Sequence, residues 1–67
     1  MTKKQIKEFA KKFAVLEKSR SKAESKTEIK EAEMAIQLLS EQLFDLGASM
    51  DDMLMIDNIV QEIIEKI

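Results

Sequence analysis

The apolar residues between positions 27 and 67 are spaced in a way that fits paired helices better than any other structure. They recur three and four residues apart, first at Ile29, Ala32, Ile36, Leu39, Leu43 and Leu46, and then at Met53, Ile56, Val60, Ile63 and Ile67. The average step of 3.5 residues is typical of helices that pack side by side along their length. Gly47 separates the two runs, where a left-handed conformation can close a helix at little cost. The pattern predicts an antiparallel helical hairpin, with helices at about 27–46 and 50–66.

A shorter amphipathic pattern precedes this hairpin and predicts a first helix at about 3–17. Its apolar positions fall on one arc of the helix, at Ile6, Phe9, Ala10, Phe13 and Leu16. Thr2 can cap this helix, and Ser49 can cap the third helix, whose first turn holds Asp51 and Asp52. Acidic side chains are favoured there by the helix dipole.

The stretch between the first two helices has Ala23 as its only apolar residue from position 17 to 28. Two structures fit it, a polar linker or a solvated extension of the first helix. We favour a linker at about 18–26, because Ser25 and Glu28 have the spacing of a capping box that starts a new helix. The prediction is a single all-α domain, residues 1–67, folded as a three-helix bundle.

The chain carries more apolar surface than one copy of such a bundle can bury. A chain of 67 residues buries only about 60% of its unfolded surface, and this one has no Cys or His to staple it with disulfides or metal. Several apolar side chains also fall outside the arcs that face the core, which predicts a homodimer that forms a larger helical bundle. The candidate partner or dimer surface consists of Met34, Leu38, Met50, Leu54 and Met55.

Charge is divided sharply along the chain. Residues 1–30 hold ten basic and four acidic side chains, whereas residues 31–67 hold one basic and nine acidic. The candidate basic binding face lies on the first helix, at Lys4, Lys7, Lys11 and Lys12. These lysines can be a solvated face of a helix that serves its own core, or they can bind an acidic protein, nucleic acid or an anionic membrane. Nucleic acid is disfavoured by the single arginine, Arg20, and by the lack of Tyr and Trp for stacking on bases.

The chain has few side chains of the types that act in catalysis, because it lacks His, Cys, Tyr and Trp altogether. Asp51, Asp52 and Asp57 do not have the spacing of a calcium loop. We therefore expect no catalytic residues, no metal or cofactor site and no small-molecule substrate.

Residues 40–60 bear a superficial likeness to a helix-turn-helix motif. Leu43 stands where that family prefers a small residue, and Ala48 replaces a larger apolar one. The helix that would read DNA begins with Met50, Asp51 and Asp52, whose carboxylates would repel phosphates. An ordinary helical turn is the better interpretation.

No stretch has the length of a membrane span, and lysines interrupt the first twenty residues where a secretory signal would need an apolar run. We expect a cytoplasmic, non-enzymatic protein-interaction module, a stoichiometric regulator or inhibitor of a partner protein. The abundance of Lys, Glu and Ile suits a bacterial or phage genome. The alternative is a nucleic-acid-binding homodimer that uses the lysine-rich first helix.

Overall fold

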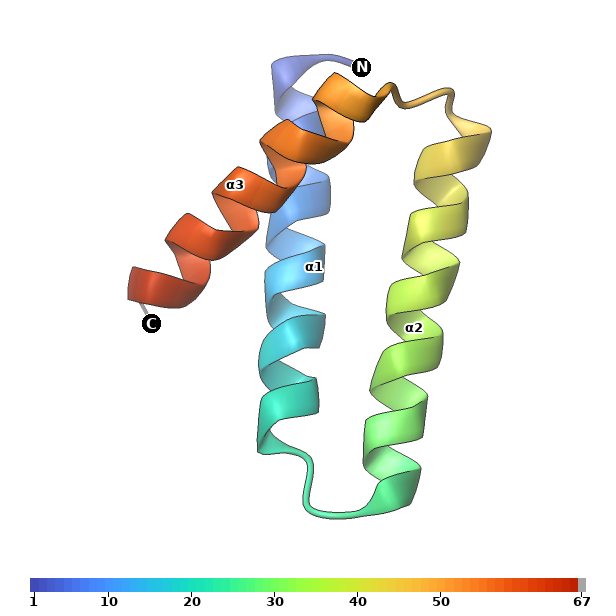
Figure 1. Ribbon diagram of the computed structural model, residues 1–67, viewed down its shortest axis with the longest axis vertical. Helices are drawn as coiled ribbons and strands as arrows, with labels where there is room; N and C mark the ends of the chain where they lie inside the picture. The colour runs from blue at the N-terminus through green and yellow to red at the C-terminus, as the bar shows by residue number, and fades with distance from the viewer. Residues whose placement is uncertain (67) are drawn as a thin grey trace.

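The computed structural model describes residues 1–66, which form three helices and no strand (Figure 1). They are α1 (Lys3–Lys22), α2 (Lys26–Asp45) and α3 (Met50–Lys66). Helix α2 runs antiparallel beside α1, and α3 crosses α1 obliquely. The predicted all-helical fold of three helices is therefore confirmed.

Helix α1 is the element to which both other helices are attached, and this corrects the predicted hairpin. Within residues 1–66, no Cα atom of α2 lies within 8 Å of one of α3. The apolar faces expected to meet each other are turned toward α1, where Phe13 lies with Leu43 of α2 and Val60 of α3 around a hollow of about 230 Å³. The antiparallel seam between α2 and α3 is not confirmed, because both helices pack against α1 and not against each other.

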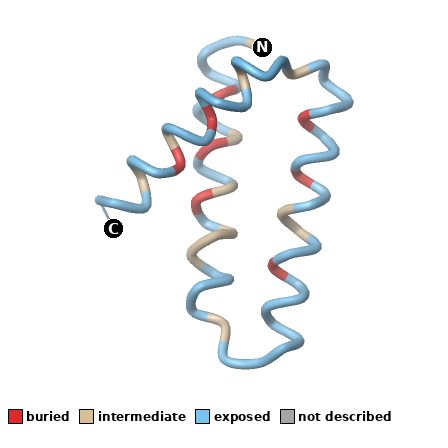
Figure 2. The backbone as a smooth tube through the Cα atoms, viewed as in Figure 1, coloured by how far each residue is buried: buried red, intermediate tan, exposed pale blue. Residues whose placement is uncertain are grey.

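The core combines two alanines of α1 with larger aliphatic residues. Ala10 and Ala14 of α1 are almost completely buried, and with Ile6, Leu43, Ile56 and Val60 they form the central cluster. Alanine side chains allow the backbones of two helices to approach closely. No large side chain among residues 1–66 is fully buried, and the buried positions lie on the sides of the helices that face one another (Figure 2).

The molecule is flat and open for its length. Its principal extents are 36 × 27 × 16 Å and its radius of gyration is 12.1 Å. A compact domain of the same length would have a radius of gyration of about 11 Å. The difference agrees with two helices that lie on neighbouring sides of α1 without closing against each other.

The predicted caps of α1 and α3 are confirmed. The Thr2 hydroxyl accepts a hydrogen bond from the Gln5 N–H, and the Gln5 side chain accepts one from the Thr2 N–H. Ser49 and Asp52 exchange the same pair of bonds at the start of α3, each 3.1 Å long. Both helix starts are thus capping boxes, which satisfy backbone donors that a helix leaves free.

The start of α2 differs from the predicted capping box in one hydrogen bond. The Ser25 hydroxyl accepts a bond from the Glu28 N–H, as expected, but the Glu28 carboxylate accepts from the N–H of Glu24 and not of Ser25. The predicted linker at 18–26 is wrong, since α1 continues to Lys22 and only residues 23–25 connect it to α2. An ion pair of 3.0 Å between Arg20 and Glu17 supports the extra turn.

Helix α2 ends just before Gly47, as the position of this glycine predicts. Gly47 has φ +79°, its N–H donates to the Phe44 carbonyl, and the Ala48 N–H donates to the Leu43 carbonyl. These two bonds define a Schellman motif. Leu46, expected in the core, instead forms the C-cap and is exposed.

Candidate functional site

The outer face of α2 carries two of the predicted surface residues. Met34 and Leu38 lie on the side of the helix away from its buried residues, and Leu38 is 59% exposed. Three carboxylates, Glu31, Glu41 and Asp45, share this side of the helix, because with Met34 and Leu38 they form a series at steps of three and four residues. The outer face of α2, meaning these five residues, is therefore apolar in its middle and acidic around it.

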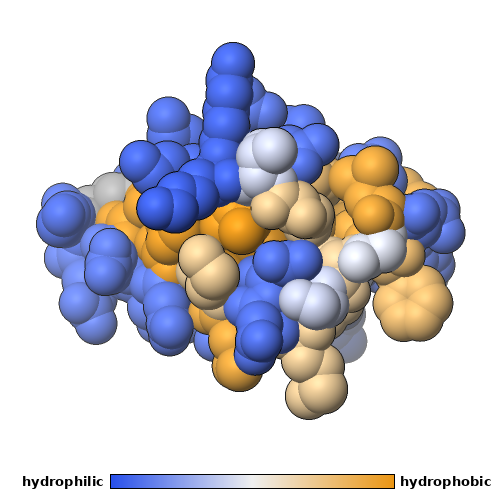
Figure 3. Space-filling model, turned by 90° about the horizontal axis from the view of Figure 1, so that it is seen from above, coloured by the Kyte–Doolittle hydropathy of each residue, from blue (hydrophilic) through white to orange (hydrophobic). Residues whose placement is uncertain are grey.

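The outer face of α3 carries the other three. Leu54 lies opposite the buried Ile56 and Val60, while Met50 and Met55 lie on the two flanks. Leu54 is 60% exposed. Since no Cα atom of α2 lies within 8 Å of one of α3, the five predicted residues lie on two separate helix faces. Seen from above, apolar side chains reach the surface between hydrophilic ones (Figure 3).

The four predicted lysines divide into two groups. Lys4, Lys7 and Lys11 follow one stripe of α1, at steps of three and four residues. Lys12 lies on another side, where its Nζ sits 5.6 Å from the centre of the Phe9 ring. This distance allows a cation–π contact.

The lysine stripe continues into a concave surface that the sequence did not reveal. A groove of about 520 Å³ lies between the second half of α1 and the end of α3. Its lining includes three lysines and three apolar side chains, Lys11, Lys18, Lys22, Ala14, Val15 and Ile63. We call this the lysine-lined groove. The sequence does not point to Lys18 and Lys22, because they fall in the predicted linker, although their spacing from Lys11 continues the same helical stripe.

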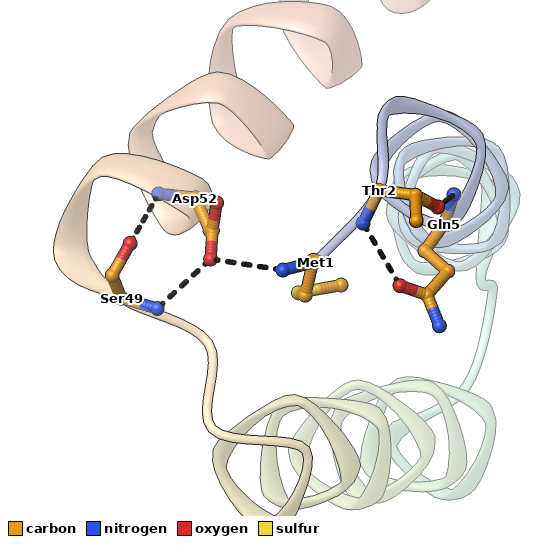
Figure 4. A network of polar contacts seen from close by, with 5 residues as sticks. All are labelled: Met1, Thr2, Gln5, Ser49 and Asp52. Atoms are coloured by element: carbon orange, nitrogen blue, oxygen red, sulfur yellow. Dashed lines mark hydrogen bonds and ion pairs between the residues drawn. The ribbon is translucent and has the colours of Figure 1, made fainter.

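A small polar network joins the starts of α1 and α3 (Figure 4). The Asp52 carboxylate accepts a bond from the Ser49 N–H and lies 3.9 Å from the amino group of Met1. The backbone hydrogen bond from Ser49 holds the pKa of Asp52 below its ordinary value of 3.8. The side chain of Met1 is buried beside this network and packs against the core. This cluster stabilises a helix start and ties two helices together.

Among residues 1–66, no group of three or more His, Cys, Asp or Glu side chains is arranged to hold a metal ion. None of the helices in this part of the chain is long and apolar enough to cross a membrane.

Comparisons with protein-family models, with curated proteins and with solved structures found no match to this chain.

Proposed function

We propose that this chain is a small non-enzymatic protein-interaction module. It self-associates, and it acts in the cytoplasm as a stoichiometric regulator or inhibitor of a partner protein. The outer faces of α2 and α3 provide the contacts, because apolar side chains that a folded chain leaves in water gain most from burial against another protein.

The exposed area of the free chain is the observation on which this proposal rests. The accessible surface is 5254 Å² for a mass of 7.7 kDa. A typical folded monomer of this mass exposes about 4300 Å². The excess of roughly 900 Å² is close to the share that one partner contributes to a standard protein interface.

The experiment compares the wild type with the double variant Leu38→Gln/Leu54→Gln. Sedimentation equilibrium over micromolar to millimolar concentration should show a wild-type mass that rises above 7.7 kDa and a variant mass that stays there. Phe44→Gln is the matched control, since Phe44 is 77% exposed but lies outside both outer faces. Circular dichroism should show equal helix content in all three proteins.

Partner binding is tested by quantitative capture with the same three proteins as bait. Proteins retained by the wild type and by Phe44→Gln, but not by the double variant, are the expected result. A wild type that remains at monomer mass throughout contradicts self-association. An identical set of captured proteins for wild type and double variant contradicts partner binding through these faces.

A nucleic-acid-binding homodimer is the second candidate, and the favouring observation is the lysine stripe of α1. The ion pairs among residues 1–66 are those of Met1 with Asp52 and of Arg20 with Glu17, and neither involves a lysine. If Lys4, Lys7, Lys11 and Lys12 bind phosphates, changing all four to Gln should abolish binding to duplex DNA while the helix content is kept. The wild-type affinity should then fall steeply with added salt.

A further inference from the structure

The lysine-lined groove combines an apolar floor with a cationic rim. Ala14, Val15 and Ile63 supply the floor, and Lys11, Lys18 and Lys22 supply the rim. The groove exists because the end of α3 diverges from α1 (Figure 1). Lys11 to Lys22 spans three turns of helix, or about 16 Å, which is the length over which a docked helix would make contact.

No carboxylate within residues 1–66 forms an ion pair with the three rim lysines. The complementary ligand therefore has carboxylates at the two edges of an apolar strip. A helix with acidic residues around one or two apolar side chains has this character, and it would present them at steps of three and four residues.

The chain itself contains such a helix face. On α2 the order of side chains is Glu31, Met34, Leu38, Glu41 and Asp45. On α1 the stripe reads Lys7, Lys11, Ala14, Lys18 and Lys22. With the two helices antiparallel, Asp45 meets Lys7, Glu41 meets Lys11, Met34 meets the alkyl stem of Lys18, and Glu31 meets Lys22. Leu38 falls at the level of Ala14 and Val15, of which only Val15 is exposed. Three pairs of opposite charge and one apolar contact, that of Leu38 with Val15, coincide in a single register.

We propose that the lysine-lined groove of one copy binds the outer face of α2 from a second copy. This inference rests on the self-association proposed above and adds the groove as the surface that receives the outer face of α2. The outer face of α2 cannot reach the groove of its own chain, because it points away from α1. The contact joins two different surfaces, so each copy offers one groove and one acidic face.

Two charge-reversed variants test the pairing. Lys11→Glu/Lys22→Glu reverses the groove, and Glu31→Lys/Glu41→Lys reverses the face. All four side chains are exposed, so the helices should form as before. Each variant alone should associate at least about tenfold more weakly than the wild type, because its groove and face now carry like charges. Mixed in equal amounts, the two variants should regain association, because every groove again meets a face of opposite charge.

Two variants with the same net charges serve as controls. Lys3→Glu/Lys12→Glu matches the groove variant, and Glu62→Lys/Glu65→Lys matches the face variant, but their exposed side chains lie outside both surfaces. Both controls should associate as the wild type does, measured by sedimentation velocity. Wild-type association should also weaken as salt is added. The neutral variant Lys11→Gln/Lys22→Gln should associate more weakly, with little dependence on salt.

Several outcomes overturn the pairing. Undiminished association of the groove variant would show that the groove takes no part, and undiminished association of the face variant would show the same for α2. Failure of the mixture to recover would exclude contact between the two surfaces, and so would equal losses in the charge controls. If the groove variant loses affinity for duplex DNA while its self-association is unchanged, the groove binds nucleic acid instead. In each case the wild type still self-associates, so the proposed function stands; a monomeric wild type removes both.

Discussion

Helix α3 and helix α2 are attached to α1 in different ways. Two buried residues of α3, Ile56 and Val60, belong to the central cluster with Ala10 and Ala14 of α1. Helix α2 contributes only Leu43, near its end, to that cluster, while its other buried residues lie outside it. The contacts that form the cluster thus lie mainly between α1 and α3.

This difference indicates which part of the molecule resists unfolding and which part is free to find another partner. A helix in a small protein is stabilised mainly by the packing of its apolar face. From Lys26 to Leu39 the buried residues of α2 are Ala32 and Leu39, with Ile36 half-buried, and the opposite side of this stretch exposes Met34 and Leu38. The helix with the weaker attachment is the one whose outer face we propose to dock on a second copy.

The largest expected effect is on the α1–α3 contact. Ile56→Ala removes a buried side chain from the cluster and should lower the free energy of unfolding by about 2–5 kcal/mol. The core of so small a domain rarely supplies more than about 5 kcal/mol in total, so much of the protein should be unfolded. Urea denaturation followed by circular dichroism measures this. Leu54→Ala, on the exposed side of the same helix, is the control and should change stability by no more than about 0.5 kcal/mol.

A smaller loss is expected in α2. Leu39 is buried, but it lies outside the cluster and beside the half-buried Ile36, so Leu39→Ala should cost about 2 kcal/mol, the lower end of the range for such changes. Hydrogen exchange should show α2 amides less protected than α3 amides, with the variant widening the gap. Leu38→Ala in dilute solution is the matched control. Equal costs for Leu39→Ala and Ile56→Ala would show that the two attachments are equivalent.

The sequence predicted those features that depend on neighbours along the chain. Thr2, Ser49 and Gly47 act within a few residues of themselves, and the structure confirms all three roles. Which apolar faces meet depends on contacts between distant segments. The arcs of α2 and α3 fit each other and fit α1 equally well as patterns, and in the structure both face α1.

The candidate surfaces were likewise predictable only where they depend on the local sequence pattern and not on contacts between distant segments. The exposure of Met34, Leu38 and Leu54 could be anticipated, because each falls outside the arc that faces the core. Their role in binding stays a prediction. The lysine-lined groove could not be anticipated, because it requires α1 to continue past residue 17 and α3 to diverge from it.

Substituting Gly47 in the turn between α2 and α3 should cost less stability than the core substitutions. Gly47→Ala should cost about 1 kcal/mol, because a left-handed backbone is unfavourable for a residue with a Cβ. Nothing lies within 4 Å of the position that the Cβ would take, so the cost comes from the backbone alone. Gly47→Asn should cost less, since Asn tolerates this conformation. A loss much greater than this, by urea denaturation, would mean that the turn also fixes how α2 and α3 diverge.

The smallest expected effect is a loss of stability in acid, which should loosen the start of α3 but not the start of α2. The pKa of Asp52 is held below 3.8 in the folded protein by the Ser49 N–H, so the folded state binds this proton less readily than the unfolded state. The stabilisation is therefore fully present above about pH 4 and is lost as the pH falls through the lowered folded-state pKa. The free energy of unfolding, measured by urea denaturation from about pH 5 to about pH 2, should fall more for the wild type than for Asp52→Asn. Asp51→Asn is the control and should behave as the wild type.

Because Asp52 also faces the amino group of Met1, its protonation should loosen the start of α3 against α1. The Ser25 cap of α2 involves neither group, so amide exchange in acid should rise in the first turn of α3 and not at the start of α2. A parallel rise at both helix starts would mean that acid acts on the whole fold. The α1–α3 contact would then owe its strength to the central cluster alone, with no contribution from the polar network at its end.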